Sequence, residues 1–104
     1  KVKGMSVFPS EIETILGRHP AIAGSGVIGR EDPEKGQVPV AFIRLDESAG
    51  SATQAELTAW CRENMATYKV PEIILTQELP LTATGKVIKE KLVEMYDNGK
   101  GQDT

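Results

Sequence analysis

The sequence predicts an α+β domain in which helices pack on a small three-stranded sheet. Its patterns follow the order helix, hairpin, helix, strand, helix, which is typical of this class. A chain of 104 residues forms one domain with a modest core. Its 39% hydrophobic and 26% charged residues are ordinary for a globular protein. We expect the domain to span residues 1–98, with a short N-terminal hairpin or loop before the first helix and a disordered tail over residues 99–104.

The first helix is predicted from a capping box, because Ser10 and Glu13 have the spacing of that motif. An apolar face follows at helical spacing, and the helix is expected to end near residues 17–20. Residues 22–29 and 38–45 are β-compatible runs joined by turn-forming residues, so they are expected to pair as an antiparallel hairpin. Pro39 places the start of the second strand near an edge or an irregularity.

The second half of the chain gives another helix signal and then a glycine–lysine loop. Thr53 and Glu56 have capping-box spacing before a run of helical periodicity that includes Leu57. Residues 72–78 predict a short strand. The last helix is expected to carry Lys86 in its first turn. Its apolar face consists of Ile88, Leu92, Met95 and Tyr96.

Lys86, directly after Gly85, is the strongest candidate for a site. The unpaired N–H groups of a helix N-terminus carry partial positive charge, so a lysine there is disfavoured unless an anion binds. A phosphate or a carboxylate is therefore the expected ligand. The segment is not a P-loop, because Pro80 stands where that motif needs glycine and Val87 where it needs Ser or Thr. A solvated lysine after a glycine turn is the alternative.

Composition argues against several classes of function. The net charge of −3 disfavours general nucleic-acid binding. No apolar stretch approaches the roughly 20 residues that span a bilayer. The single Cys61 excludes an internal disulfide and favours a reducing compartment, which we expect to be the cytoplasm. With one histidine and one cysteine, the usual zinc sites are excluded, and we expect no metal ligands.

The remaining polar residues do not assemble a complete enzyme. Lys1, Lys3 and Gly4 form either a solvent-facing strand or a loop whose glycine allows an extended ligand to approach closely. His19 lacks an acidic partner and Cys61 has core spacing, so neither is expected to be catalytic. No nucleophile, general base and oxyanion hole occur together. Because the chain begins inside a strand or turn, we expect a piece of a longer protein, although design or proteolysis would explain that boundary equally.

Four segments resemble, in order and spacing, the C-terminal domain of adenylate-forming enzymes, and in particular of acyl-CoA synthetases. The similar segments are residues 1–13 (KVKGMSVFPSEIE), the hairpin over 27–42, residues 68–71 (YKVP) and residues 79–89 (LPLTATGKVIK). The resemblance covers nearly the whole chain. It implies a ligase that uses ATP, Mg²⁺ and CoA, with a large N-terminal adenylation domain that binds the nucleotide and the carboxylic acid. The small domain is then inactive alone.

The resemblance also implies two half-reactions served by one alternating domain. Lys86 is implied to enter the active site during adenylation, with Thr84 and Gly85 supporting its loop. After a rotation of the domain, the opposite face is implied to meet CoA, with Gly4 lining the tunnel for the pantetheine arm. The residues implied to flank that face are Lys1, Lys3, Met5 and Ser6.

Two residues depart from the family pattern. Gln37 replaces an acidic residue that is common in the hairpin, and Lys89 stands where arginine is frequent. Because lysine does not reproduce a bidentate arginine contact, a phosphate or interdomain contact from Lys89 is not expected.

Two other functions stay open beside the synthetase. A freestanding module with the same fold would bind or interact without catalysis. A cap of an adenylation domain that uses another acceptor would differ only in where the acyl group goes. The acid is not readable from this domain, although fatty acid metabolism is one expected setting. The isolated domain exposes an interface through which it can self-associate.

Overall fold

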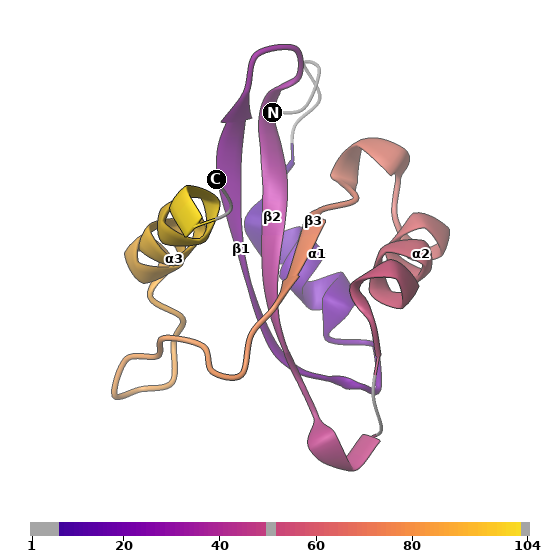
Figure 1. Ribbon diagram of the computed structural model, residues 1–104. Helices are drawn as coiled ribbons and strands as arrows, with labels where there is room; N and C mark the ends of the chain where they lie inside the picture. The colour runs from indigo at the N-terminus through magenta and orange to yellow at the C-terminus, as the bar shows by residue number, and fades with distance from the viewer. Residues whose placement is uncertain (1–6, 50–51, 103–104) are drawn as a thin grey trace.

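The computed structural model describes the backbone of residues 7–49 and 52–102, and its α+β architecture confirms the predicted class (Figure 1). The elements follow the predicted order, with two short 3₁₀ helices added. They are α1 (Pro9–Leu16), β1 (Ile22–Asp32), β2 (Gly36–Leu45), η1 (Glu47–Ala49), α2 (Gln54–Asn64), η2 (Thr67–Lys69), β3 (Glu72–Leu75) and α3 (Lys89–Gln102). The hairpin or loop expected at the N-terminus falls on residues 1–6, which lie outside the described residues.

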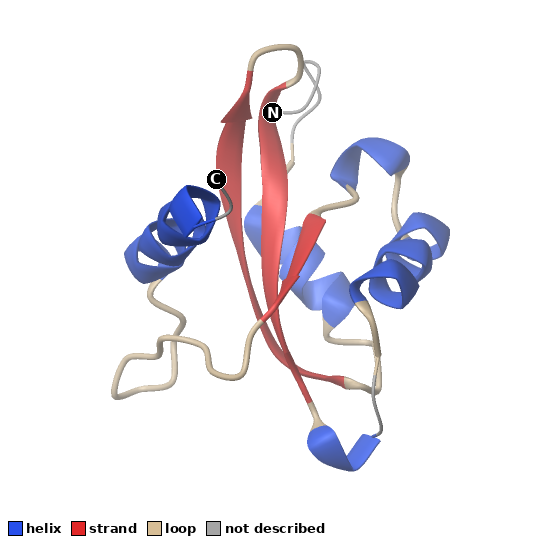
Figure 2. Ribbon diagram, viewed as in Figure 1, coloured by secondary structure: helices blue, strands red, loops and turns tan. Residues whose placement is uncertain are grey.

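The three strands form one mixed sheet in the order β1-β2-β3 (Figure 2). β1 and β2 pair antiparallel around the turn at residues 32–36, which confirms the predicted hairpin. β3 runs parallel to β2 and ends at Leu75 rather than at residue 78. Because β3 pairs with β2 only from Val40 onward, Pro39 precedes the segment that is paired on both sides, and its missing N–H is tolerated there.

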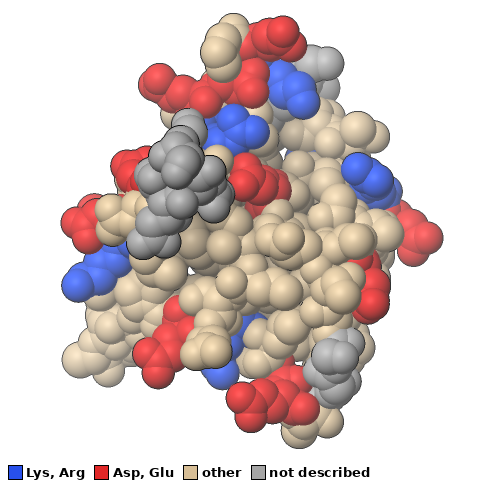
Figure 3. Space-filling model, in the orientation of Figure 1, with Lys and Arg blue, Asp and Glu red and all other residues tan. Residues whose placement is uncertain are grey.

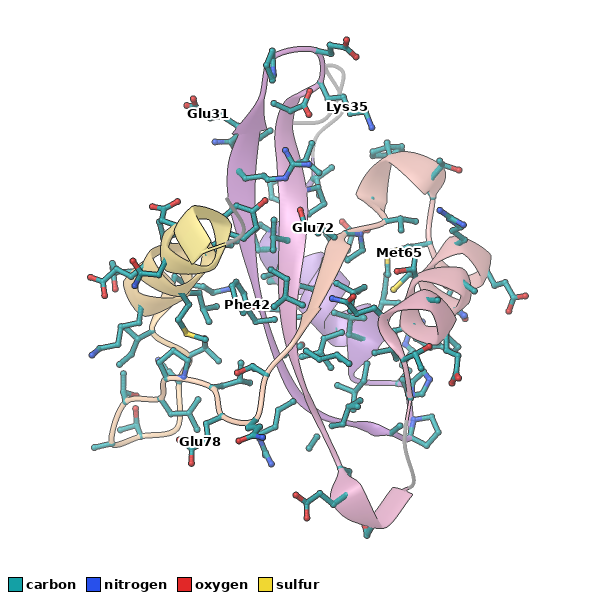
Figure 4. All side chains as sticks on the ribbon, in the orientation of Figure 1. Glu31, Lys35, Phe42, Met65, Glu72 and Glu78 are labelled. Carbon is teal, nitrogen blue, oxygen red and sulfur yellow. The ribbon has the colours of Figure 1, made fainter. Side chains whose placement is uncertain are left out.

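The sheet lies between two layers of helix, with α1 and α2 on one face and α3 on the other (Figure 1). Neighbouring side chains of a strand point to opposite faces of the sheet. In β1, Val27 therefore packs on the face covered by α1 and α2, and Ile28 packs on the face covered by α3. Figure 4 shows Phe42 of β2 between the sheet and α3. The larger core contains Ile12, Leu16, Val27, Ala41, Ile43, Leu57, Cys61 and Ile73. The smaller core contains Ile28, Val40, Phe42 and Leu92.

The two predicted capping boxes have different outcomes. At α2 the motif is present, because the Thr53 side chain accepts a hydrogen bond from the Glu56 N–H at 3.1 Å. At α1 the prediction is wrong: Phe8 is the N-cap residue and makes no side-chain cap, and the helix starts one residue before Ser10. A proline at the first helical position is pre-organised for that start. The carboxylate of Glu13 is used in a contact with β1 instead.

α3 begins later and ends later than the sequence indicates. Its first residue is Lys89, so Lys86 is not in its first turn, and that prediction is wrong. Leu92 is fully buried against the sheet, and Met95 and Tyr96 pack beside it as expected. The helix continues to Gln102 and overlaps most of the expected tail, while residues 103–104 lie outside the described part of the chain.

A polar cluster across the sheet ties the far half of α3 to the strands. Glu72 at the start of β3, labelled in Figure 4, accepts hydrogen bonds from Arg30 Nε and from the Tyr96 hydroxyl, both at 3.1 Å. Burial, followed by the neighbouring Glu72 carboxylate, raises the pKa of the Tyr96 hydroxyl. The cluster joins β1, β3 and α3 above the smaller core.

We predict that Gly26→Ala destabilises the domain by about 1–3 kcal/mol, as overpacking does in other cores. A Cβ at Gly26 would lie 2.7 Å from Leu92 Cδ1 and 2.8 Å from Val87 Cγ1, inside the contact between β1 and α3. Urea unfolding monitored by circular dichroism measures the change in free energy of unfolding.

Gly29→Ala is the matched control for this prediction, since it lies on the same strand. Its Cβ would meet only the end of the exposed Gln37 side chain, at 3.3 Å from Oε1. We expect little loss of stability there, because the neighbour can move and alanine suits a strand better than glycine. Equal destabilisation by the two variants would contradict the proposed packing role of Gly26.

Candidate functional site

A tight hairpin between β3 and α3 carries the sequence-predicted lysine. Its arms meet at an antiparallel bridge between Leu81 and Val87. The Thr82 N–H donates to the Lys86 carbonyl at 2.8 Å, and the Gly85 N–H donates to the Thr82 carbonyl at 2.9 Å. This pattern is typical of a three-residue loop that ends in a left-handed glycine. We call residues 81–87 the lysine hairpin.

Gly85 and the threonines fix the shape of the lysine hairpin. Gly85 has a φ of +87°, a conformation that glycine adopts without strain. Thr82 Oγ1 accepts a hydrogen bond from the Lys86 N–H at 3.1 Å and lies 3.0 Å from Thr84 Oγ1. Sequence reasoning named Thr84 and Gly85 as supporting residues but did not single out Thr82. A hydroxyl side chain four residues before Lys86 was the sequence feature that could have identified Thr82.

The Lys86 side chain projects from this hairpin and is exposed. Among the described residues no hydrogen bond or ion pair involves its ammonium group. α3 starts three residues later, so Lys86 does not lie at the N-terminus of a helix, where partial positive charge would disfavour a lysine. Leu81, on the facing arm, is 50% exposed, so an apolar side chain accompanies the cation at this surface. The described structure therefore leaves the Lys86 side chain open to solvent.

The base of the lysine hairpin is fixed to the body of the domain. The Ile88 N–H donates to the Pro80 carbonyl at 2.8 Å, which closes the loop below the Leu81–Val87 bridge. Val87 packs over Gly26 in the smaller core. The hairpin is therefore short, hydrogen-bonded on both arms and seated on β1.

Lys89, the first residue of α3, makes contacts within the domain. Its Nζ donates to the Val27 carbonyl at 2.7 Å and bonds Glu13 Oε2. The same Glu13 oxygen accepts the Val27 N–H at 2.9 Å. We call these three residues the edge network. The Lys89 ammonium is therefore paired within the domain.

The other predicted site residues are not placed. Lys1, Lys3, Gly4, Met5 and Ser6 lie outside the described residues, so their roles stay predictions. The described chain starts at Val7, close to the N-terminus of α1. Within the described part of the chain, the structure brings together Thr84, Gly85 and Lys86 of the predicted site residues.

Lys69 and Tyr68 form a separate contact beside α1. The Lys69 ammonium forms an ion pair with Glu11 of α1 and lies 5.7 Å from the centre of the Tyr68 ring. The hydrogen bond to Glu11 raises the pKa of Lys69. These contacts join the connector after α2 to α1.

His19 and Cys61 have structural surroundings, as expected. His19 Nδ1 accepts the Ala21 N–H at 3.0 Å, and its ring packs edge-on against Trp60 with centroids 5.0 Å apart. Cys61 is fully buried, and this burial raises the pKa of its thiol to about 11. In the described part of the chain no group of three His, Cys, Asp or Glu residues is placed to hold a metal ion. No described helix is long and apolar enough to cross a bilayer.

Charges of both signs are interspersed on the surface around these elements. Figure 3 shows acidic side chains along with separate basic ones on the face that it displays, in keeping with the net charge of −3. The candidate site is the exposed Lys86 on the hydrogen-bonded lysine hairpin.

A protein-family model, the AMP-binding enzyme C-terminal domain, matches residues 11–86. The match runs from α1 through the lysine hairpin and includes Lys86. The chain belongs to this family.

The curated relatives are much longer ligases. The 2-succinylbenzoate–CoA ligase of Bacillus velezensis is 43% identical over 93 residues, which is 88% of this chain and 18% of the relative. The enzyme of the same name from Geobacillus kaustophilus is 44% identical over 90 residues, with 86% and 18% covered. This chain therefore spans less than a fifth of the length of these relatives and matches one domain of a CoA ligase.

Solved structures of the same superfamily share the fold. The o-succinylbenzoate CoA synthetase of Bacillus subtilis, in complex with an acyl-adenylate intermediate, has a TM-score of 0.77 and 36% identity, covering 88% of this chain and 18% of that chain. The fatty acyl CoA synthetase of Mycobacterium tuberculosis has a TM-score of 0.82 and 28% identity, covering 94% and 19%.

We predict that the Cys61 thiol reacts with iodoacetamide at pH 8 on the order of 100-fold more slowly in the folded domain than in urea. Burial holds the folded thiol in its unreactive protonated form. Since the folded thiol keeps its proton to higher pH than the unfolded one, its contribution to stability is lost as the pH rises from about 8.5 toward 11. Mass spectrometry of the alkylated chain measures the rate, and equal rates in both states would contradict this placement.

Proposed function

We propose that this chain is the catalytic-lysine cap of an ATP-dependent carboxylic acid–CoA ligase, and that it acts together with a large N-terminal adenylation domain. The observation that carries the proposal is the exposed Lys86 side chain, directly after the loop of a hydrogen-bonded hairpin, in a chain of this family. The membership of the relatives among CoA ligases supports this choice over a non-catalytic module or a different acceptor.

Lys86 would act in the adenylation step. A carboxylate oxygen of the acid attacks the α-phosphorus of ATP, an acyl–phosphate bond forms, and the bond to pyrophosphate breaks. Two anionic groups approach each other in this step. A cation held between their oxygens stabilises the transition state and orients the reactants. The N-terminal domain would hold any Mg²⁺ that takes part, and the ion would supply further positive charge for this step.

The opposite face of the domain would serve the thioester step. The sulfur of CoA attacks the acyl carbon, the thioester bond forms, and AMP leaves with the electrons of the broken acyl–oxygen bond. Gly4 would line the path of the pantetheine arm, with Lys1, Lys3, Met5 and Ser6 beside it. A domain that rotates between two positions can supply both faces in turn.

The relatives suggest which carboxylic acids to test first as substrates. The 2-succinylbenzoate ligases make that aromatic dicarboxylate the first acid to test, and the fatty acyl synthetase makes a fatty acid the second. Supplies of ATP and CoA, together with one buried cysteine, favour the cytoplasm. The isolated cap would be inactive, because it would lack the nucleotide and acyl pockets of its partner domain.

In the complete enzyme, Lys86→Ala is expected to slow acyl-adenylate formation by about 10²- to 10³-fold, the effect of removing one transition-state charge contact. Thioester formation from supplied acyl-adenylate should change little, because Lys86 would be turned away in that step. Exchange of labelled pyrophosphate into ATP measures the first step, and release of AMP on addition of CoA measures the second.

Lys91→Ala is the matched control for Lys86→Ala, since Lys91 is an exposed lysine on the nearby α3. It should leave both steps unchanged. Equal loss of both half-reactions in Lys86→Ala would refute the assigned role, and unchanged adenylation would refute the proposed function of the hairpin.

Gly4→Leu in the complete enzyme is expected to have the reverse effect. A branched side chain would narrow the pantetheine path, so the thioester step should slow by about 10-fold or more while pyrophosphate exchange is retained. Stopped-flow measurement of AMP release as a function of CoA concentration tests this. A variant that slows only the adenylation step would contradict the assignment of Gly4 to the pantetheine path.

A further inference from the structure

At Val27 the outer edge of β1 is bonded by two side chains. β1 is an edge strand of the described sheet, so the backbone groups that point away from β2 need other partners. At Val27 both are satisfied: the N–H by Glu13 at 2.9 Å and the carbonyl by Lys89 at 2.7 Å. Glu13 and Lys89 also bond each other, so the edge network is a closed ring of three contacts.

The edge network joins all three layers of the domain. Glu13 comes from α1 on one face of the sheet, and Lys89 comes from α3 on the other face. The two side chains are partly exposed, at 27% and 43%. Hydrogen bonds in which the donor or the acceptor is charged are stronger than neutral ones. The network therefore fixes the position of the first residue of α3 relative to both β1 and α1.

The fixed end of α3 is also the base of the lysine hairpin. Lys89 follows Lys86 by three residues, and the two residues between them are held. Val87 bridges Leu81 and packs over Gly26, while the Ile88 N–H bonds Pro80. The chain from the edge network to the catalytic candidate therefore has little freedom.

We propose that Lys89 is a positioning residue for the adenylation step: together with Glu13 it fixes the lysine hairpin, and so the Lys86 ammonium, relative to the rest of the cap. This inference rests on the proposed function of Lys86. Lys89 touches no substrate in this arrangement, since its donors are directed to Val27 and Glu13. A displacement of about 1 Å in a catalytic group costs about 10²-fold in rate. A loosened hairpin should therefore slow the adenylation step.

A double-mutant cycle in the complete enzyme tests the proposal. The variants are Lys86→Ala, Lys89→Met and the combination of the two, with Lys91→Met as the control on the exposed face of α3. Methionine keeps the length and helix propensity of lysine but removes its charge and its donors. Both half-reactions are measured for each variant, with the KM for ATP and for the acid.

Lys89→Met is expected to lower the rate of adenylation by about 10- to 100-fold with little change in KM, and to spare thioester formation from supplied acyl-adenylate. Combined with Lys86→Ala it should cause no further loss, because no lysine is left to position. Lys89→Arg should restore most of the rate, since arginine can donate to the same two oxygens. Glu13→Gln should give a smaller loss, because the amide oxygen still accepts the Val27 N–H.

Different failures point to different errors. Equal loss of both half-reactions in Lys89→Met, or a double variant whose loss is the product of the single losses, overturns the positioning role and leaves Lys89 with general stability alone. No effect of Lys89→Met on either step also overturns it. If Lys86→Ala itself leaves adenylation intact, the proposed function fails first, whatever Lys89 does.

Discussion

The seating of α3 on β1 depends on a missing side chain at Gly26. Leu92 and Val87 occupy the space that a Cβ would take, at 2.7 and 2.8 Å from its ideal position. Interiors are close-packed, so this approach cannot be kept while a methyl group is added. Val87 also belongs to the lysine hairpin, and the site is therefore built on the same contact that closes the smaller core. Stability and the placement of Lys86 share one physical origin.

The elements whose residues include characteristic turn or capping motifs were predictable from the sequence. The hairpin at residues 22–45 and the cap at Thr53 have local chemistry that determines them, and the structure has both. The cap predicted at Ser10 failed because the helix already starts at Pro9, and the Glu13 carboxylate bonds the Val27 N–H, 14 residues away. A spacing rule cannot register a tertiary competitor for the same carboxylate. The edge network was invisible for the same reason, since its members are far apart in sequence.

The conformation of the lysine hairpin was predicted incorrectly. Gly85 and Lys86 were expected at a helix start, where an unpaired cation would call for an anion. In the structure the glycine ends a hairpin loop and the helix begins at Lys89. The apolar periodicity from Val87 onward misled the prediction, because Val87 packs inward from a bridge and not from a helix. Core burial produces the same one-sided pattern in either conformation, so periodicity alone cannot separate them.

On the proposed function, an exposed cation would suit a domain that docks and leaves repeatedly. In water the Lys86 ammonium is fully solvated, and a contact in solvent contributes little. Inside a closed site the same charge meets phosphate and carboxylate oxygens at low effective dielectric, where the attraction is many times larger. On the proposed function the attraction is greatest while ATP and the acid are both bound, and it weakens when pyrophosphate departs with most of the negative charge. Because the hairpin carries Lys86 toward the bound anions, this change in attraction would act mainly on the Lys86 ammonium. Departure of the product would thus release the cap for the second half-reaction, without any further signal.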